Sequence, residues 1–81
     1  MMKTATIYHP DGKQTTITPG DGKKFSLEEL QKAVGGYIEQ VPRHRNVWCN
    51  EDGLRMGLAP NADASSRFGV NLVGDVCEVS R

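Results

Sequence analysis

Four side chains in this sequence have the chemistry to bind a transition metal: His9, His44, Cys49 and Cys77. Neutral imidazoles and thiolates form structural zinc sites, in which the ligands come in closely spaced pairs such as CxxC or HxxxH. No two of these four residues have such a spacing. We therefore expect no metal centre, and in a reducing cytoplasm we expect both cysteines to be free thiols.

The other groups that could do chemistry also lack a catalytic pattern. Ser65 and Ser66 in "DASSRF" have neither the GxSxG elbow nor a histidine at a recognisable motif spacing. Glu51 and Asp52 are neighbours in a turn, where solvated turn chemistry accounts for them. The glycines and lysines of "GDGKK" match neither GxxxxGK[ST] nor GxGxxG. We therefore expect no enzymatic activity and no bound cofactor.

The strongest surface candidate is the segment "PRHRNVW". It places Arg43, His44 and Arg45 in a short connection and Trp48 on the strand that follows. Arginine and tryptophan are the residue types that anchor interfaces, and together they can also hold a phosphate backbone with a base stacked on the ring. We take Arg43, His44, Arg45 and Trp48 as the candidate partner-binding set. The alternative is an ordinary solvated loop with Trp48 in the core.

A second candidate set belongs to a different class of function. The loop "GLAPNADASSR" carries polar groups that could hold a small ligand or a signalling nucleotide, namely Asn61, Ser65, Ser66 and Arg67. Direct nucleic-acid binding is a third alternative, and it is not favoured. Ten lysines and arginines balance ten aspartates and glutamates, so bulk charge indicates neither a nucleic-acid binder nor an acidic mimic.

The stretch "FSLEELQKAVGGYIEQVP" predicts a helix at about residues 26–35 followed by a strand. Ser26 and Glu29 form a capping box, in which each side chain satisfies the other residue's backbone N–H at a helix start. Leu30 and Val34 lie on one face of this helix, and the polar residues between them point elsewhere. The double glycine that follows supplies the left-handed conformation that ends a helix.

Alternation of β-prone residues and the turn signals between them predict the remaining elements. An N-terminal hairpin is expected across "HPDG" and a second one across "NEDG", and Asn61 or Asp63 could cap a short helical turn that runs through Arg67. The expected strands are residues 3–8, 13–18, 37–41, 47–50, 54–56 and 75–79. The expected fold class is α+β, a small mainly antiparallel sheet of two hairpins and a C-terminal strand covered by one helix.

The length and hydropathy of the chain limit its class further. Its 81 residues are expected to form one domain, 1–81, with a single thin core and no room for a deep active site. There is no apolar run near 18 residues, and no signal-peptide core follows "MMKTATIYHP". We therefore expect a soluble protein in the cytoplasm of a bacterial cell, with no membrane contact.

The ordered set "LEELQKAVGGYIEQVP", "NEDGLRMGLAPNADA" and "GDVCEV" resembles a family of small phage-, prophage- and plasmid-borne proteins classed as a domain of unknown function. The resemblance covers roughly residues 26–79. It implies an origin in a mobile element, and it brings no established activity, cofactor or catalytic residue. Together with the absence of catalytic motifs, it favours a non-enzymatic accessory protein that binds and inhibits a host protein or protein complex, for instance a counter-defence protein of the anti-CRISPR kind.

Overall fold

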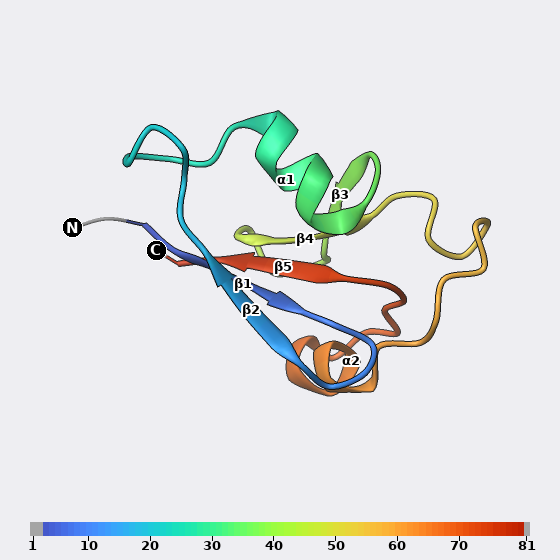
Figure 1. Ribbon diagram of the computed structural model, residues 1–81. Helices are drawn as coiled ribbons and strands as arrows, with labels where there is room; N and C mark the ends of the chain where they lie inside the picture. Colours follow the sequence, from blue (N-terminus) through green and yellow to red (C-terminus); the bar gives the residue numbers. More distant parts are fainter. Residues whose placement is uncertain (1–2, 81) are drawn as a thin grey trace.

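A computed structural model describes residues 3–80 of the chain as one five-stranded sheet with two helices (Figure 1). In chain order the elements are β1 (Ala5–Tyr8), β2 (Gln14–Ile17), α1 (Leu27–Val34), β3 (Ile38–Gln40), β4 (Val47–Asn50), α2 (Ala62–Phe68) and β5 (Val76–Val79). The strands lie in the order β2-β1-β5-β4-β3, and every neighbouring pair is antiparallel. The α+β class expected from the sequence is confirmed.

Helix α1 forms as the sequence predicts. The Ser26 hydroxyl accepts a hydrogen bond from the Glu29 N–H at 3.1 Å, and the Glu29 carboxylate accepts one from the Ser26 N–H at 2.9 Å. Gly35 ends the helix with a φ of 78°, in the left-handed region that glycine adopts without strain. Leu30 and Val34 are the buried residues of the helix, so its predicted apolar face packs on the sheet.

The prediction for the second hairpin is wrong. Strand β4 pairs with β3 and β5, and the expected strand at 54–56 does not form. That segment coils instead into tight turns, in which the Met56 N–H donates to the Asp52 carbonyl at 2.9 Å and the Leu58 N–H to the Gly53 carbonyl at 3.0 Å. Local turn bonds therefore satisfy the backbone groups that a strand would have offered to a partner. The second hairpin is β3–β4, closed across "RHRN".

The short helical turn predicted after "GLAPN" is present as α2, and Asn61 is its N-cap. Helix α2 lies on the opposite side of the sheet from α1 (Figure 1). The sheet therefore has apolar residues on both faces, and the expectation of a single core is wrong. The cluster on the α1 face contains Ala5, Ile7, Leu30, Val34 and Cys77, and the cluster on the α2 face contains Tyr8, Val41, Val47, Ala64, Phe68, Leu72 and Val76.

The two faces explain how each strand divides its side chains. Successive residues of a strand point to opposite faces, so a strand covered on both sides buries neighbours in two different cores. On β5, Val76 faces α2 and Cys77 faces α1, and both are fully buried. On β4, Val47 packs on the α2 side while Trp48 packs partly buried on the α1 side.

The helix face can be tested by substitution. Replacing Leu30 with Ala should lower the free energy of unfolding by about 2–4 kcal/mol because it empties a packed position. Replacing Ser26 with Ala should cost about 1 kcal/mol through the lost cap. Leu27→Ala is the matched control, because this leucine is 59% exposed and its loss should change stability by no more than about 0.5 kcal/mol. Chemical denaturation of the three variants checks the order, and equal midpoints for Leu27→Ala and Leu30→Ala would contradict it.

Candidate functional site: a basic hairpin beside a polar trough

The connection between β3 and β4 is a tight turn with a strained backbone. The Val41 N–H donates to the Val47 carbonyl at 2.9 Å, and the His44 N–H donates to the Val41 carbonyl at 3.1 Å. Between these bonds Arg43 has a φ of 71°. Within residues 3–80, no other non-glycine residue has a positive φ. A side chain in this region costs about 1–3 kcal/mol, so the surrounding structure must impose the conformation.

Two side chains of this turn fix it to the rest of the fold. The His44 Nε2 atom lies 3.1 Å from the Phe68 carbonyl oxygen, so Nε2 carries the proton and donates it. The two rings also meet edge to face, with centroids 5.1 Å apart. The Asn46 amide donates to the Val79 carbonyl at 2.7 Å, and the Val79 N–H donates to the Asn46 carbonyl at 2.8 Å. Arg43 and Arg45, which alternate with these anchors, are exposed.

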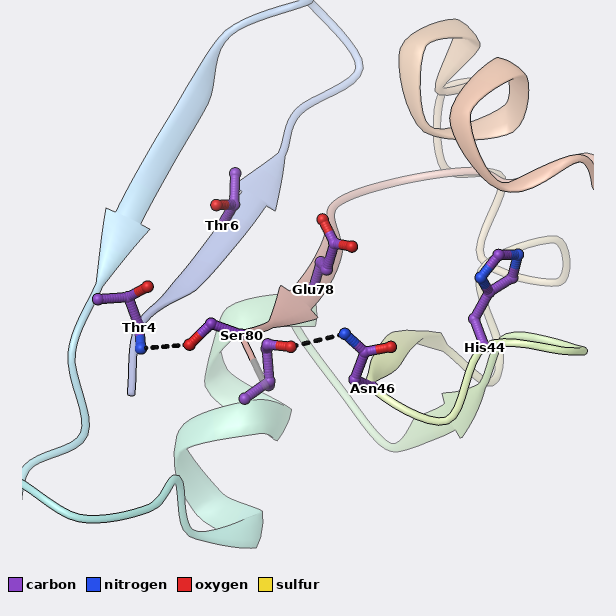
Figure 2. Close-up of a pocket in the computed structure, with 7 residues that line it drawn as sticks. Thr4, Thr6, His44, Asn46, Glu78 and Ser80 are labelled. Carbon is purple, nitrogen blue, oxygen red and sulfur yellow. Dashed lines mark hydrogen bonds between the residues drawn. The ribbon is translucent and has the colours of Figure 1, made fainter. Parts of the chain in front are cut away.

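A polar trough of about 500 Å³ opens beside the hairpin, on the part of the sheet that α2 leaves uncovered. Figure 2 shows Glu78 of β5 between Thr6 of β1 on one side and His44 on the other. Thr4 and Ser80 close one end, where the Thr4 N–H donates to the Ser80 hydroxyl at 2.9 Å. The residues that line the trough are Thr4, Thr6, His44, Asn46, Glu78, Val79 and Ser80.

The carboxylate of Glu78 is fixed by a buried phenol. The Tyr8 hydroxyl donates to Glu78 Oε1 at 2.7 Å. Burial, followed by the hydrogen bond to Glu78 and the negative charge of that residue, raises the pKa of Tyr8 to about 12. The Arg67 guanidinium lies over the Tyr8 ring, 4.8 Å from the centroid, and pairs with Asp63 at 3.5 Å. Arg67 therefore packs on the phenol that holds the Glu78 carboxylate in the trough.

The structure separates the four residues of the predicted partner-binding set. Arg43, His44 and Arg45 are together in the hairpin turn. Trp48 lies on the other face of the sheet, paired with Cys77 of β5 and packed partly buried against the α1 cluster. Arg45 and Trp48 do share the lining of another, smaller pocket of about 310 Å³ that also includes Lys24. Arg43 and His44 do not line that pocket, so Arg45 is the residue of the turn that the tryptophan lies beside.

The structure does not assemble the alternative ligand-binding set. Asn61 is fully buried: its Oδ1 accepts from the Ala64 N–H at 3.0 Å, and its amide donates to the Tyr8 and Gly74 carbonyls at 2.7 and 2.8 Å. The Ser65 hydroxyl accepts from the Leu72 N–H at 2.8 Å. The side chains of Asn61 and Ser65 are therefore bonded to the backbone and are not available to a ligand. Ser66 is exposed, but it lacks the polar neighbours that the hypothesis of a ligand site in this loop needs.

The two cysteines lie on opposite faces of the sheet. Cys77 is buried beneath α1, where burial raises the pKa of its thiol to about 11. Cys49 packs against the α2-side cluster, and burial followed by the nearby charge of Glu39 raises the pKa of that thiol as well. Both thiols are therefore protonated at neutral pH. Within residues 3–80 no three metal-ligating side chains come together.

Thr6 and Glu78 are the trough residues that sequence reasoning missed. The available signal was alternation: in the predicted strands they occupy the same face as Tyr8 and Val76, which are apolar and buried. A threonine and a glutamate on a face that is elsewhere apolar indicate a region of the sheet that no helix covers. The pairing of β1 with β5 was needed to bring the two residues together.

The fold and the site define a small α+β protein that presents an anchored basic turn beside an open polar trough. The chain belongs to the family described as "Domain of unknown function (DUF3846)", whose sequence model matches residues 2–81. This confirms the resemblance to a domain-of-unknown-function family. No curated protein and no solved structure matches the chain. Neither helix within residues 3–80 is long and apolar enough to cross a membrane.

The buried amide of Asn61 gives a stability prediction. Asn61→Ala removes three hydrogen bonds between a buried side chain and backbone groups, so it should lower the free energy of unfolding by about 3 kcal/mol or more. Asn71→Ala is the matched control, because that asparagine is exposed and its loss should stay within about 0.5 kcal/mol. Equal denaturant midpoints for the two variants would show that Asn61 does not hold the segment.

The raised pKa of Tyr8 predicts how stability changes at alkaline pH. The unfolded chain loses the tyrosine proton near the ordinary value of 10, while the folded protein keeps it up to about 12. Between these values the folded state binds more protons, so stability falls as pH rises. Tyr8→Phe should remove this part of the slope. Denaturation midpoints measured from pH 8 to 11.5 for both proteins check it, and parallel curves would refute the assignment.

Proposed function

We propose that this chain is a mobile-element accessory protein that binds and inhibits a host protein or protein complex, with the β3–β4 turn as its contact surface. The mobile-element origin is supported by the resemblance of the quoted segments to phage-, prophage- and plasmid-borne proteins. A counter-defence protein of the anti-CRISPR kind is the specific form of this proposal. Inhibition then comes from occupying a surface of the host macromolecule.

The observation that carries the proposal is the strained, anchored presentation of Arg43 and Arg45. Strain at a non-glycine residue persists only where the structure imposes it, and such residues cluster at functional sites. Here His44 and Asn46 hold the turn through the Phe68 and Val79 carbonyls. The two arginines are therefore presented on a backbone that loses little freedom on binding, which lowers the entropic cost of an interface.

Charge supports an acidic partner surface. The chain has a formal net charge of zero, so its long-range field does not attract nucleic acid or any other polyanion in bulk. Two exposed arginines in one turn create a local positive patch instead. Their planar guanidinium groups suit bidentate contacts with carboxylates, and a phosphate backbone is the alternative acceptor of the same geometry.

A small polar ligand in the trough is a second candidate function. The volume of about 500 Å³ is in the range of small-molecule sites. Glu78 supplies an acceptor and Thr6 a hydroxyl, an arrangement suited to a ligand with hydroxyl or amino groups. The trough takes the place of the Gly57–Arg67 loop in this alternative, because Asn61 and Ser65 bind backbone.

Charge reversal tests the proposed contact surface. The double variant Arg43→Glu/Arg45→Glu should keep its thermal midpoint within a few degrees, because both side chains are exposed, and should lose at least tenfold in partner capture from a bacterial host extract. Lys13→Glu/Arg55→Glu is the matched control, because it also reverses two exposed cations. Lys13 lies in the β1–β2 connection, and Arg55 follows the end of β4 that is away from the β3–β4 turn. Nuclease treatment of the extract distinguishes a protein partner from a nucleic acid.

A second variant separates strain from binding. Arg43→Gly relieves the left-handed backbone, so its thermal midpoint should hold or rise while capture weakens. Unchanged capture by the folded double glutamate variant, or equal losses in the double variant and its control, would reject the hairpin turn as the contact surface.

A further inference from the structure

Three polar side chains form a continuous hydrogen-bonded chain at the other end of the sheet. His9 Nδ1 lies 2.8 Å from Asp75 Oδ1, and His9 Nε2 lies 2.8 Å from the Thr15 hydroxyl. The residues come from three places in the chain: His9 follows β1, Thr15 lies in β2, and Asp75 precedes β5. None of them lines the trough, and none lies in the β3–β4 turn.

The order of these contacts determines the role of each imidazole nitrogen. The Asp75 carboxylate accepts a hydrogen bond, so it selects the tautomer with the proton on Nδ1. Nε2 then has a free lone pair, and the Thr15 hydroxyl donates to it. A carboxylate that orients a base, and a base that contacts a hydroxyl, is the arrangement that activates a hydroxyl nucleophile. The side chains of His9 and Asp75 are 28% and 39% exposed, so a substrate can approach them.

An apolar pocket of about 470 Å³ adjoins the imidazole, between β1, β2 and α1. Its apolar lining comes from Ile7, Ile17 and Ala33, and the polar side chains of its wall are His9, Thr18, Glu29, Lys32 and Asp75. Thr15 pairs with Ile7 across the hairpin and is two residues from Ile17, so its side chain lies on the same face. Thr15 does not itself line the pocket, but its hydroxyl meets the imidazole of His9, which does. The apolar part of the lining is suited to a short acyl chain.

The backbone of β2 has an N–H group that can stabilise the negative charge formed on a carbonyl oxygen when a hydroxyl attacks the carbonyl. β2 is an edge strand, and within residues 3–80 it pairs with β1 alone. The His9 N–H donates to the Lys13 carbonyl at 2.9 Å, so His9 and Lys13 are a hydrogen-bonded pair of the hairpin. Hydrogen-bonded and non-hydrogen-bonded pairs alternate along an antiparallel ladder, so Ile7–Thr15 is hydrogen-bonded and Thr6–Thr16 is not. The N–H of Thr16 is therefore directed away from β1. An unpaired N–H on the residue after a nucleophile is in a position to stabilise an oxyanion.

We propose that Thr15 is a nucleophile for acyl transfer from small esters with short acyl chains, that His9 is its general base and that Asp75 is a positioning residue. Thr15 Oγ1 attacks the ester carbonyl while its proton passes to His9 Nε2. The bond to the alcohol oxygen then breaks, and His9 returns the proton to the leaving alcohol. Water hydrolyses the acyl-threonine by the same proton transfers in reverse, releasing the carboxylic acid and free Thr15.

The test uses the full chain with p-nitrophenyl acetate and p-nitrophenyl butyrate. The expected results are release of nitrophenol and a mass increase of one acyl group on the peptide that contains Thr15. Thr15→Val should abolish this label, and Thr15→Ser should keep it on the same residue. Ser66→Ala removes an exposed hydroxyl elsewhere and should leave the rate unchanged. Label on lysines or other residues, or an undiminished rate in Thr15→Val, would overturn the proposal.

Two further variants separate proton transfer from structural support. His9→Gln should lower the acylation rate at least a hundredfold, in the range that a general base contributes. Asp75→Ala should lower it at least tenfold, and sodium formate should restore part of the rate where sodium chloride at equal ionic strength does not. A structural role for Asp75 predicts no such rescue. The Arg43→Glu/Arg45→Glu protein should acylate at the wild-type rate, so this proposal and the proposed binding function can fail independently.

Discussion

The arrangement of the whole molecule depends on the position of β5, the last strand of the chain, in the middle of the sheet. β1 pairs with one edge of β5 and β4 with the other, so β5 joins the two hairpins in the sheet. Its alternating side chains also join the two layers: Val76 belongs to the core beneath α2 and Cys77 to the core beneath α1. Glu78, the next residue, lies on the α2 side beyond the reach of that helix and becomes the carboxylate of the trough.

A second constraint acts where α2 joins the sheet. The helix has only seven residues and cannot be stable on its own, so it depends on packing and on its cap. Asn61 supplies that cap and also binds the Tyr8 and Gly74 carbonyls, which ties the helix start to β1 and to the segment before β5. One buried side chain thus places α2 over Tyr8, and the remainder of that face stays open as the trough.

Local signals made part of this fold predictable from the sequence. The capping box at Ser26, the turn in "HPDG" and the cap at Asn61 each depend on residues close together in the chain, and each element forms as predicted. The strand at 54–56 was wrong because its residues are compatible with a strand but find their hydrogen bonds in local turns. The order of strands in the sheet was not predictable, because it depends on pairing between segments about seventy residues apart.

The same distinction between local and distant contacts explains what could be foreseen of the sites. Arg43, His44 and Arg45 were identifiable because they are consecutive, whereas the position of Trp48 against the α1 cluster required knowledge of which faces the helices cover. His9 and Thr15 are diagonal neighbours in the register of the predicted hairpin, so their contact was within reach of the sequence. Asp75 was not, because it meets His9 only through the pairing of β1 with β5.

The two proposed sites lie near opposite ends of β5, and that placement has a physical reason. Between Val76 and Cys77 the strand is covered on both faces, so no side chain there can meet a partner without loss of the core. Exposure begins only where the helices end: at Asp75 on one side, and at Glu78 and the hairpin turn fixed to Val79 on the other. A central strand of four residues that is buried on both faces offers surface chemistry at its ends.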